Sequence, residues 1–405
     1  MSTVAPAPIA LAQRMKALEP SATLAMAAKA KEAKAKGKPV YDFTLGEPDF
    51  TTPAHICAAA NAAMAAGHTH YTVASGLPEL KAAVAKQYTD RHGLEYKANQ
   101  VVISNGAKHS LHNVFTVLVN EGDEVVIPAP YWVSYAELVK LAGGAPVILP
   151  TTAESNFKLS PEALRKAITP RTKILLLCSP SNPTGTVYSP DELGALADVC
   201  IEHDLLVISD EIYDQLVYDD RPYASFPTVR AGLADRTVIV NGVSKSYAMT
   251  GWRIGWTLSP ANVAAAMADL QSQETSNPCS ISQYAAIAAV SGPQECVAEM
   301  KAAFSKRRAW VRDRIKSLPN VLCPEMDGAF YAFIGVQAYL GKSYNGKVIN
   351  GTTEWCLELL AQQNVATVMG SAFGAEGFVR ISYATSDEIL AKGFDGIEAF
   401  LKSAK

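Results

Sequence analysis

The stretch VSKSYAMTGWRIG runs from Val243 to Gly255 and holds one lysine, Lys245, and one arginine, Arg253. Small, apolar and turn-forming residues make up most of the remainder. A solvated face would carry more charge than this, and a plain core segment would carry none. The role of the two cations therefore depends on what the rest of the chain places beside them.

Apolar runs of strand length precede this stretch, and several of them are separated by helical stretches such as 108–119 and 131–143. The runs are VVIS (101–104), EVVIP (124–128), PVILP (146–150), KILLLC (173–178), DLLVIS (204–209) and RTVIV (236–240). They do not alternate apolar with polar residues, which is typical of a sheet buried on both faces and therefore largely parallel. Ligands of such sheets bind at loops beyond the carboxyl ends of the strands. We therefore look for chemistry in the loops SNGAK, PAPYW, SPSNPTG, SDEIY and VSKS.

The rest of the chain predicts a smaller α+β unit beside this α/β unit. A helix-favouring segment covers 23–36, and a long amphipathic helix is predicted over 296–318. Short strand-like runs and a closing helix from Ser386 follow it. We predict an N-terminal arm with part of the small domain over 1–50, a large domain over 51–295 and a small C-terminal domain over 296–405.

The composition excludes several classes of protein. The chain is 49% hydrophobic and 19% charged, and its formal net charge is -3, so it shows no basic surface suited to nucleic acid or an anionic membrane. No apolar run approaches the roughly 18 residues of a membrane helix, and the N-terminus lacks the features of a signal peptide. The seven cysteines are scattered without a C-x-x-C pair, which favours free thiols in a reducing compartment. We expect a cytoplasmic protein of the size of an enzyme.

The polar side chains in the loops have ordinary structural explanations when each is taken alone. Asn182 could support its own turn, Asp210 could cap the following helix, and Lys245 could extend along apolar surface to water. The alternative explanation is chemical. A lysine desolvated among small side chains loses its proton more easily and becomes a nucleophile. Arg253 lies between two glycines, which would let the backbone pass close to an anion bound by the guanidinium.

Together, these side chains match the functional groups of one small molecule. The predicted partners are Lys245 for a carbonyl, Asp210 for a basic ring nitrogen, Asn182 and Tyr213 for a hydroxyl, and Ser244 and Arg253 for a phosphate. Pyridoxal phosphate carries all four groups, and it acts as an electron sink for carbanions. Asp210 would keep the ring nitrogen protonated, and Trp132 in PAPYW could stack on the ring.

The order of the motifs resembles that of the class I aminotransferases, which belong to the fold-type I pyridoxal-phosphate enzymes. LGEPDF, GAK, PYWVSY, SPSNPTG, SDEIY, VSKSYAMTGWRIG and FVRISYATS follow one another, so the resemblance covers nearly the whole chain. Among family members, the motifs are most similar to those of bacterial aspartate aminotransferases. The resemblance implies transfer of the amino group of L-aspartate to 2-oxoglutarate, giving oxaloacetate and L-glutamate. It also implies a large domain with a mainly parallel central sheet flanked by helices, and a smaller α+β domain.

Other functions stay open at this point. The same chemistry could act on aromatic amino acids, alanine, kynurenine or prephenate-derived acceptors, and the same scaffold could support a lyase. A regulator that carries a helix-turn-helix domain would need a longer N-terminus than this one. A binding module without activity would not need Lys245 together with every expected partner.

The resemblance implies a role for each matching residue in cofactor binding. Lys245 matches the lysine that bonds to the cofactor aldehyde and later moves a proton to and from the substrate α-carbon. Asp210, Tyr213, Asn182 and Trp132 match the contacts to the ring and its substituents. The phosphate-binding positions match Ala107, Lys108, Ser244 and Arg253.

The resemblance further implies contacts to the substrate and to a second subunit. Arg380 matches the arginine that binds the α-carboxylate through two parallel hydrogen bonds, and Gly46 matches a backbone contact. Lys108 matches the lysine thought to hold the distal carboxylate, although it could instead serve only the phosphate or solvent. Tyr71 matches a tyrosine that reaches the phosphate of the neighbouring subunit, which implies a homodimer with shared active sites. Glu19 stands where relatives active on prephenate carry a lysine, so we expect little prephenate activity.

No metal site is expected. His109 and His112 are three residues apart on a predicted helix, but a metal would need more ligands nearby. We interpret both histidines as structural.

Overall fold

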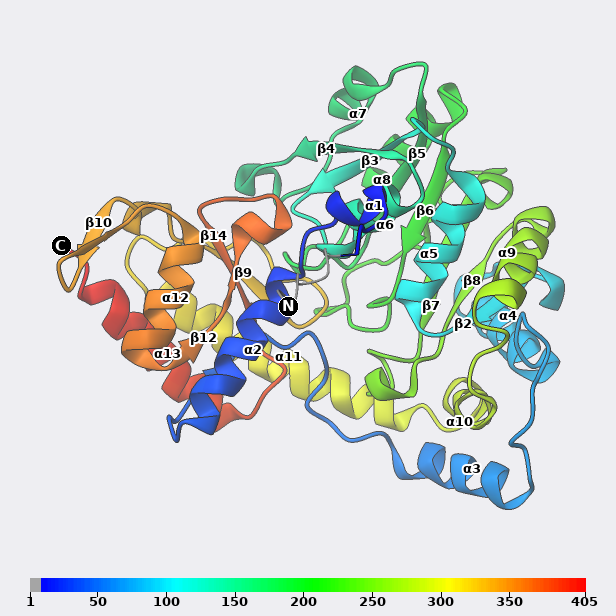
Figure 1. Ribbon diagram of the computed structural model, residues 1–405, viewed down its shortest axis with the longest axis horizontal. Helices are drawn as coiled ribbons and strands as arrows, with labels where there is room; N and C mark the ends of the chain where they lie inside the picture. The colour runs from blue at the N-terminus through cyan, green and yellow to red at the C-terminus, as the bar shows by residue number, and fades with distance from the viewer. Residues whose placement is uncertain (1–8) are drawn as a thin grey trace, which may run out of the picture.

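The computed structural model describes residues 9–405, and its larger unit is built on a seven-stranded sheet (Figure 1). The strand order is β2-β8-β7-β6-β5-β3-β4, and only β8 runs antiparallel to its neighbours. The strands are β2 (Val101–Ser104), β3 (Glu124–Ala129), β4 (Ala145–Pro150), β5 (Thr172–Cys178), β6 (Leu206–Asp210), β7 (Thr237–Gly242) and β8 (Gly255–Leu258). The prediction of a mainly parallel sheet is confirmed, but β8 was missed because four residues that begin with glycine carry little strand signal.

Both faces of this sheet are covered, as the unbroken apolar strands predict. On β3, Val125 and Ile127 pack with one set of helices, while Val126 between them packs on the opposite face. The first set is α5 (Ala107–Leu118), α6 (Ser134–Leu141) and α9 (Ala261–Glu274), and the opposite face carries α7 (Pro161–Ala167) and α8 (Pro190–Glu202). A further group packs near β2 and β8, namely α3 (Ala54–Ala65), α4 (Pro78–His92) and α10 (Ser280–Ser291).

The smaller unit combines both ends of the chain. It contains a three-stranded antiparallel sheet, β13-β14-β9, and a hairpin, β10-β11. The parallel pair β1-β12 joins the N-terminal segment to the C-terminal part (Figure 1). The elements are α2 (Ala22–Ala35), β1 (Tyr41–Asp42), α11 (Glu295–Lys316), β9 (Tyr331–Gly335), β10 (Lys342–Tyr344), β11 (Lys347–Ile349), α12 (Thr352–Gln363), β12 (Val365–Ala366), β13 (Val368–Met369), β14 (Phe378–Ser382) and α13 (Asp387–Lys402).

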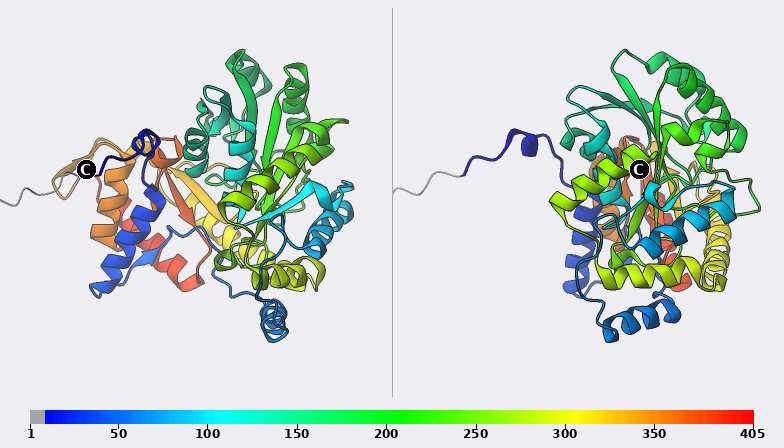
Figure 2. Two further views of the ribbon diagram at one scale, coloured as in Figure 1. Left: turned by 45° about the vertical axis from the view of Figure 1, so that its right-hand side comes forward. Right: turned by 90° about the vertical axis from the view of Figure 1, so that its right-hand side faces the viewer.

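The predicted domain boundaries at residues 50/51 and 295/296 stay a prediction. The first eight residues of the predicted arm lie outside the described residues. The next part of the arm, with α1 (Gln13–Lys16), stands clear of the body in the right-hand view of Figure 2. Its apolar side chains are exposed, with Ile9 at 90% and Leu11 at 68%.

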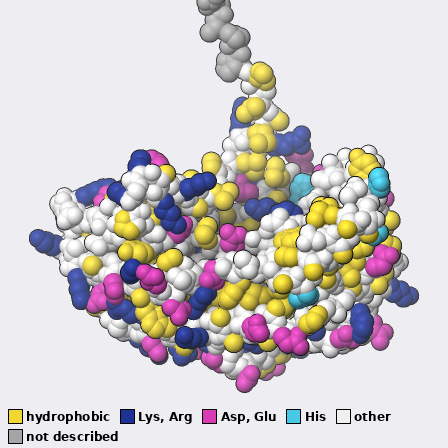
Figure 3. Space-filling model, turned by 90° about the horizontal axis from the view of Figure 1, so that it is seen from below, with side chains coloured by type: hydrophobic (Ala, Val, Ile, Leu, Met, Phe, Trp, Pro, Cys, Tyr) yellow, Lys and Arg dark blue, Asp and Glu magenta, His cyan; other side chains and the backbone are white. Residues whose placement is uncertain are grey.

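The surface shows acidic and basic side chains interspersed on the face in Figure 3. Between residues 9 and 405, no helix is both long and apolar enough to cross a lipid bilayer. Over the same range, all seven cysteines are free.

Candidate active site

A cavity of about 410 Å³ lies where the carboxyl ends of β5, β6 and β7 meet the smaller unit. These three strands are parallel neighbours, so the loops after them leave the sheet at one edge. All the site residues predicted from the sequence except Tyr71 line this cavity: Gly46, Ala107, Lys108, Trp132, Asn182, Asp210, Tyr213, Ser244, Lys245, Arg253 and Arg380. Residues as far apart in the chain as Gly46 and Arg380 therefore share one site.

Asp210 is the last residue of β6 and is only 3% exposed. Its Oδ2 accepts a hydrogen bond from the Tyr135 hydroxyl at 2.6 Å, and its Oδ1 accepts one from the backbone N–H of Ile212 at 3.2 Å. Burial raises the pKa of Asp210 to about 6, and the bond from Tyr135 opposes this rise. Tyr135 was missed because an aromatic residue on an amphipathic helix cannot be distinguished from a core residue by its pattern.

Lys245 follows β7 and donates from Nζ to the carbonyl oxygen of Gly46 at 2.6 Å. Burial lowers the pKa of Lys245 to about 8, while the Glu47 carboxylate opposes this decrease. The amine therefore loses its proton far more easily than a lysine in water, as desolvation predicts. No carboxylate lies at ion-pair distance from Lys245 among residues 9–405, so only the longer-range attraction of Glu47 and Asp210 opposes the effect of burial.

The phosphate-binding positions predicted from the sequence gather around the start of α5. Arg253 has a left-handed backbone with φ +57° and donates from Nη1 to the Thr250 carbonyl at 2.8 Å. The role expected for the two glycines beside it, close approach of the backbone to an anion, stays a prediction. Nothing lies within 4 Å of a Cβ built on Gly251, whereas a Cβ on Gly255 would lie 2.3 Å from the backbone nitrogen of Ala107. Gly255 therefore allows β8 to pass α5, so packing alone already requires a glycine at this position.

Lys108 and Trp132 lie together at the same cavity. Nζ of Lys108 is 4.9 Å from the centre of the Trp132 ring, a cation–π distance. Burial, together with the nearby Arg253, lowers the pKa of Lys108. Trp132 also meets Tyr135 edge-on, with ring centres 5.4 Å apart.

Arg380, on β14, brings a buried cation to the site from the smaller unit. It is 1% exposed, and its Nη1 and Nη2 donate to Asn182 Oδ1 at 3.0 Å and to the Thr44 carbonyl at 2.7 Å. Its Nε is buried without a hydrogen-bond partner, and among residues 9–405 no carboxylate forms an ion pair with it. Burying a charge without a counter-ion is costly, so this position suits an anionic ligand.

Two tyrosine hydroxyls connect the two units. Oη of Tyr213 lies 2.9 Å from Oη of Tyr331, which comes from β9, and the guanidinium of Arg380 lies 4.6 Å from the Tyr331 ring centre. Tyr331 was missed because a tyrosine inside the apolar run GAFYAFIG reads as core.

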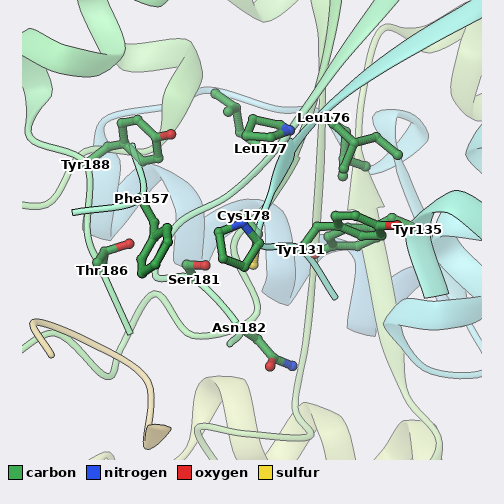
Figure 4. A pocket seen from close by; sticks show the side chains of 13 residues that line it. Tyr131, Tyr135, Phe157, Leu176, Leu177, Cys178, Ser181, Asn182, Thr186 and Tyr188 are labelled. Atoms are coloured by element: carbon green, nitrogen blue, oxygen red, sulfur yellow. The ribbon is translucent and has the colours of Figure 1, made fainter. Parts of the chain in front are cut away.

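A second cavity, of about 20 Å³, lies next to Asn182 (Figure 4). Asn182, Tyr135 and Cys178 line both cavities and form the wall between them.

Tyr71 and Glu19 lie apart from the groups above. Tyr71 is 89% exposed and borders a separate cavity with Asn277 and Cys279, so a single chain does not bring it to Lys245. Glu19 shares an adjoining cavity of about 320 Å³ with Lys108. A hydrogen bond raises the pKa of Lys140 and burial raises that of Tyr131, and the charge of the Glu19 carboxylate adds to both increases.

His109 and His112 belong to α5 and face the end of α9. Nε2 of His112 is 3.2 Å from Glu274 Oε1, and Nε2 of His109 is 3.9 Å from Glu274 Oε2. Over residues 9–405, no group of three or more histidine, cysteine or acidic side chains is arranged to hold a metal ion.

Comparisons with known proteins agree across nearly the whole chain. A family model described as aminotransferase class I and II matches residues 38–397. The aspartate aminotransferase of Geobacillus stearothermophilus is 48% identical over 97% of this chain and 99% of its own. The aspartate/prephenate aminotransferase of Cereibacter sphaeroides is 46% identical over 96% of this chain and 98% of its own. The crystal structure of the aspartate aminotransferase from Rhizobium meliloti superimposes with a TM-score of 0.95, at 41% identity over 98% of this chain and 100% of that one.

The bond between Tyr135 and Asp210 can be tested in the protein without any added ligand. In Tyr135→Phe, the carboxylate loses a hydrogen-bond donor. We therefore expect the pKa of Asp210, which is about 6 in the unmodified protein, to increase by roughly one to two. Infrared difference spectra of the carboxyl C=O stretch across pH 4 to 9 measure this pKa, and Asp210→Asn identifies the band. An unchanged midpoint in Tyr135→Phe would show that the hydroxyl does not stabilise the carboxylate.

Proposed function

The chain belongs to the class I and II aminotransferases, and from this premise we propose that it is a pyridoxal-phosphate-dependent aspartate aminotransferase. The amino group of L-aspartate passes to 2-oxoglutarate, giving oxaloacetate and L-glutamate. The observation that carries the proposal is the buried Arg380, which lines the same cavity as Lys245, has an Nε without a hydrogen-bond partner and pairs with no carboxylate among the described residues. An arginine in this state matches the α-carboxylate that every amino acid substrate carries.

The side chains of the cavity fit the proposed cofactor. When bound, pyridoxal phosphate supplies an electron sink for the carbanion formed at the substrate α-carbon. Asp210 offers a buried carboxylate for a protonated ring nitrogen, and Tyr213 and Asn182 offer hydrogen bonds to the ring hydroxyl. Arg253 and Ser244, with the unpaired N–H groups at the start of α5, suit a phosphate dianion.

Lys245 is the residue that we propose moves the proton. With a pKa of about 8, its Nζ is close enough to neutrality to accept and return a proton near physiological pH. The hydrogen bond from Nζ to the Gly46 carbonyl holds the amine inside the cavity. Gly46 belongs to the N-terminal segment that packs with the smaller unit, so this segment helps to position the amine as well as to shield it from water.

Selectivity for a dicarboxylate is assigned to Lys108. Its ammonium group lies at the cavity beside Trp132, and it leaves Arg380 free for the α-carboxylate. Several relatives are named aspartate aminotransferases, and their names support aspartate over aromatic donors, alanine or kynurenine. Other relatives carry both aspartate and prephenate in their names. In this chain the acidic Glu19 lines the cavity that adjoins the site and would repel a second carboxylate there, which argues against prephenate as a main acceptor.

The proposal includes a cytoplasmic homodimer with shared active sites. Tyr71 is exposed and distant from the cavity of its own chain, as a residue that serves a second subunit would be. The exposed apolar side chains of the projecting arm, Ile9 and Leu11, also suit burial against a second copy. The free cysteines suit a reducing compartment.

The function is tested by following the visible absorption of the protein, reconstituted with pyridoxal phosphate, during titration with amino acids. We expect L-aspartate to bleach the yellow band at concentrations at least about tenfold lower than L-phenylalanine, because one ion pair of this kind is worth over 1 kcal/mol. Lys245→Ala is the matched control, and its turnover should fall by about a hundredfold or more. A preference for phenylalanine would move the enzyme to the aromatic group. A protein that binds no pyridoxal phosphate would contradict the proposal altogether.

Arg380 and Lys108 are the two cationic side chains proposed to bind the substrate, and a variant of each distinguishes their roles. Arg380→Ala should raise KM for aspartate and for alanine alike, by about a hundredfold, because both substrates lose their partner for the α-carboxylate. Lys108→Ala should raise KM for aspartate by about tenfold and leave alanine nearly unchanged. Steady-state kinetics with both donors measure the difference. Equal losses for the two donors in Lys108→Ala would remove the distal-carboxylate role from this residue.

The shared active site is tested by mixing two inactive variants. Lys245→Ala and Tyr71→Phe place their defects on different chains, so a mixed dimer contains one site that carries both defects and one site that carries neither. Activity should recover to about a quarter of the unmodified value after equal amounts are unfolded and refolded together. No recovery, with light scattering showing a fully active unmodified monomer, would exclude the role of Tyr71.

A further inference from the structure

Both polar backbone groups of Asn105 are engaged in the turn that leads into α5. Its N–H donates to Nδ1 of His109 at 3.2 Å, and its carbonyl oxygen accepts from Nη2 of Arg253 at 3.3 Å. We propose that His109 is a positioning residue for the phosphate-binding end of the site, and that it acts through the backbone of Asn105. This inference rests on the proposed function, because it presumes a phosphate at the start of α5.

The hydrogen-bond geometry sets the state of the imidazole. Nδ1 can accept the Asn105 N–H only if it carries no proton, so the neutral ring holds its proton on Nε2. Nε2 faces Glu274 Oε2 at 3.9 Å, and a carboxylate on that side favours this tautomer. The His109 side chain is 13% exposed, and burial lowers its pKa, so the ring is neutral at physiological pH. His112, on the same helix face, contacts Glu274 but makes no hydrogen bond to Asn105.

The turn has little freedom to compensate for the loss of this bond. Gly106 has φ +85°, and a Cβ built there would lie 2.3 Å from Nη2 of Arg253, so the guanidinium packs directly on the turn. The Asn105 N–H belongs to the peptide that joins Ser104 to Asn105, and the carbonyl that holds Nη2 belongs to the next peptide, so Asn105 links the two hydrogen bonds. If the N–H lost its acceptor, movement of Asn105 would displace this carbonyl, and with it Nη2 and the turn at Gly106 that leads into α5. The acceptor atom on His109 therefore helps to hold both the guanidinium and the start of α5, which the proposed phosphate needs.

A purely structural explanation is that His109 only joins α5 to α9 through Glu274. The two explanations separate by substitution, because an asparagine side-chain oxygen can replace Nδ1 as an acceptor but cannot reproduce the ring contact to Glu274. His112→Leu is the matched control, since it removes a neighbouring imidazole from Glu274 and leaves the bond to Asn105 intact.

The experiment measures binding to the cofactor-free protein at pH 7.5 by titration calorimetry, with sulfate and with pyridoxal phosphate as probes. We expect His109→Leu to weaken both by about tenfold, the size of one unpaired buried donor, and His109→Asn to recover most of this loss. His112→Leu should bind both like the unmodified protein. Leucine binding as tightly as histidine, or asparagine binding as weakly as leucine, would overturn the inference.

Two further outcomes are separable from these. If the unmodified protein binds neither probe, the proposed function fails rather than the role of His109. If His109→Leu does not fold, hydrogen exchange at the Asn105 amide decides the question. Slow exchange in both His109→Asn and His112→Leu supports the inference, and fast exchange in His109→Asn with unchanged sulfate affinity overturns it.

Discussion

The parallel pairing of β5, β6 and β7 is the constraint on which the site depends. Cys178 pairs with Asp210, and Asp210 pairs with Val240, so the three strands end almost level. Because the three strands run parallel, the loops after them leave at the same edge of the sheet. That arrangement places the amide of Asn182, the carboxylate of Asp210 and the amine of Lys245 around one cavity, although they are separated by 63 residues along the chain from first to last.

The same burial that creates the site also carries an electrostatic cost. It raises the pKa of Asp210 to about 6, lowers that of Lys245 to about 8, and leaves Arg380 without a carboxylate partner among residues 9–405. Each of these groups has given up water without gaining a full counter-charge, which costs stability. A ligand with a basic nitrogen, an aldehyde and anionic groups would recover much of this cost. The electrostatics of the cavity therefore favour a ligand that carries these groups.

The smaller unit completes the site instead of merely covering it. Arg380 donates to Asn182, and Tyr331 meets Tyr213, so hydrogen bonds cross from the antiparallel sheet to the strand ends of the larger unit. The N-terminal segment adds the carbonyls of Thr44 and Gly46. Because β1 pairs with β12, this early segment and Arg380 belong to one body of the structure.

The amino-acid sequence by itself determined the class of fold, the family and most of the cavity lining. Unbroken apolar strands require a doubly covered sheet, and motifs at strand ends can be recognised locally, so both predictions were confirmed by the topology and by the family match. The tertiary structure alone decided which residues support those motifs. Tyr135, Tyr331 and Thr44 resemble core or loop residues in sequence, because a hydrogen bond to Asp210, Tyr213 or Arg380 depends on distances that no local pattern encodes. Gly255 shows the same limit, because the backbone of α5, more than 140 residues away in the chain, leaves no room for a Cβ at this position.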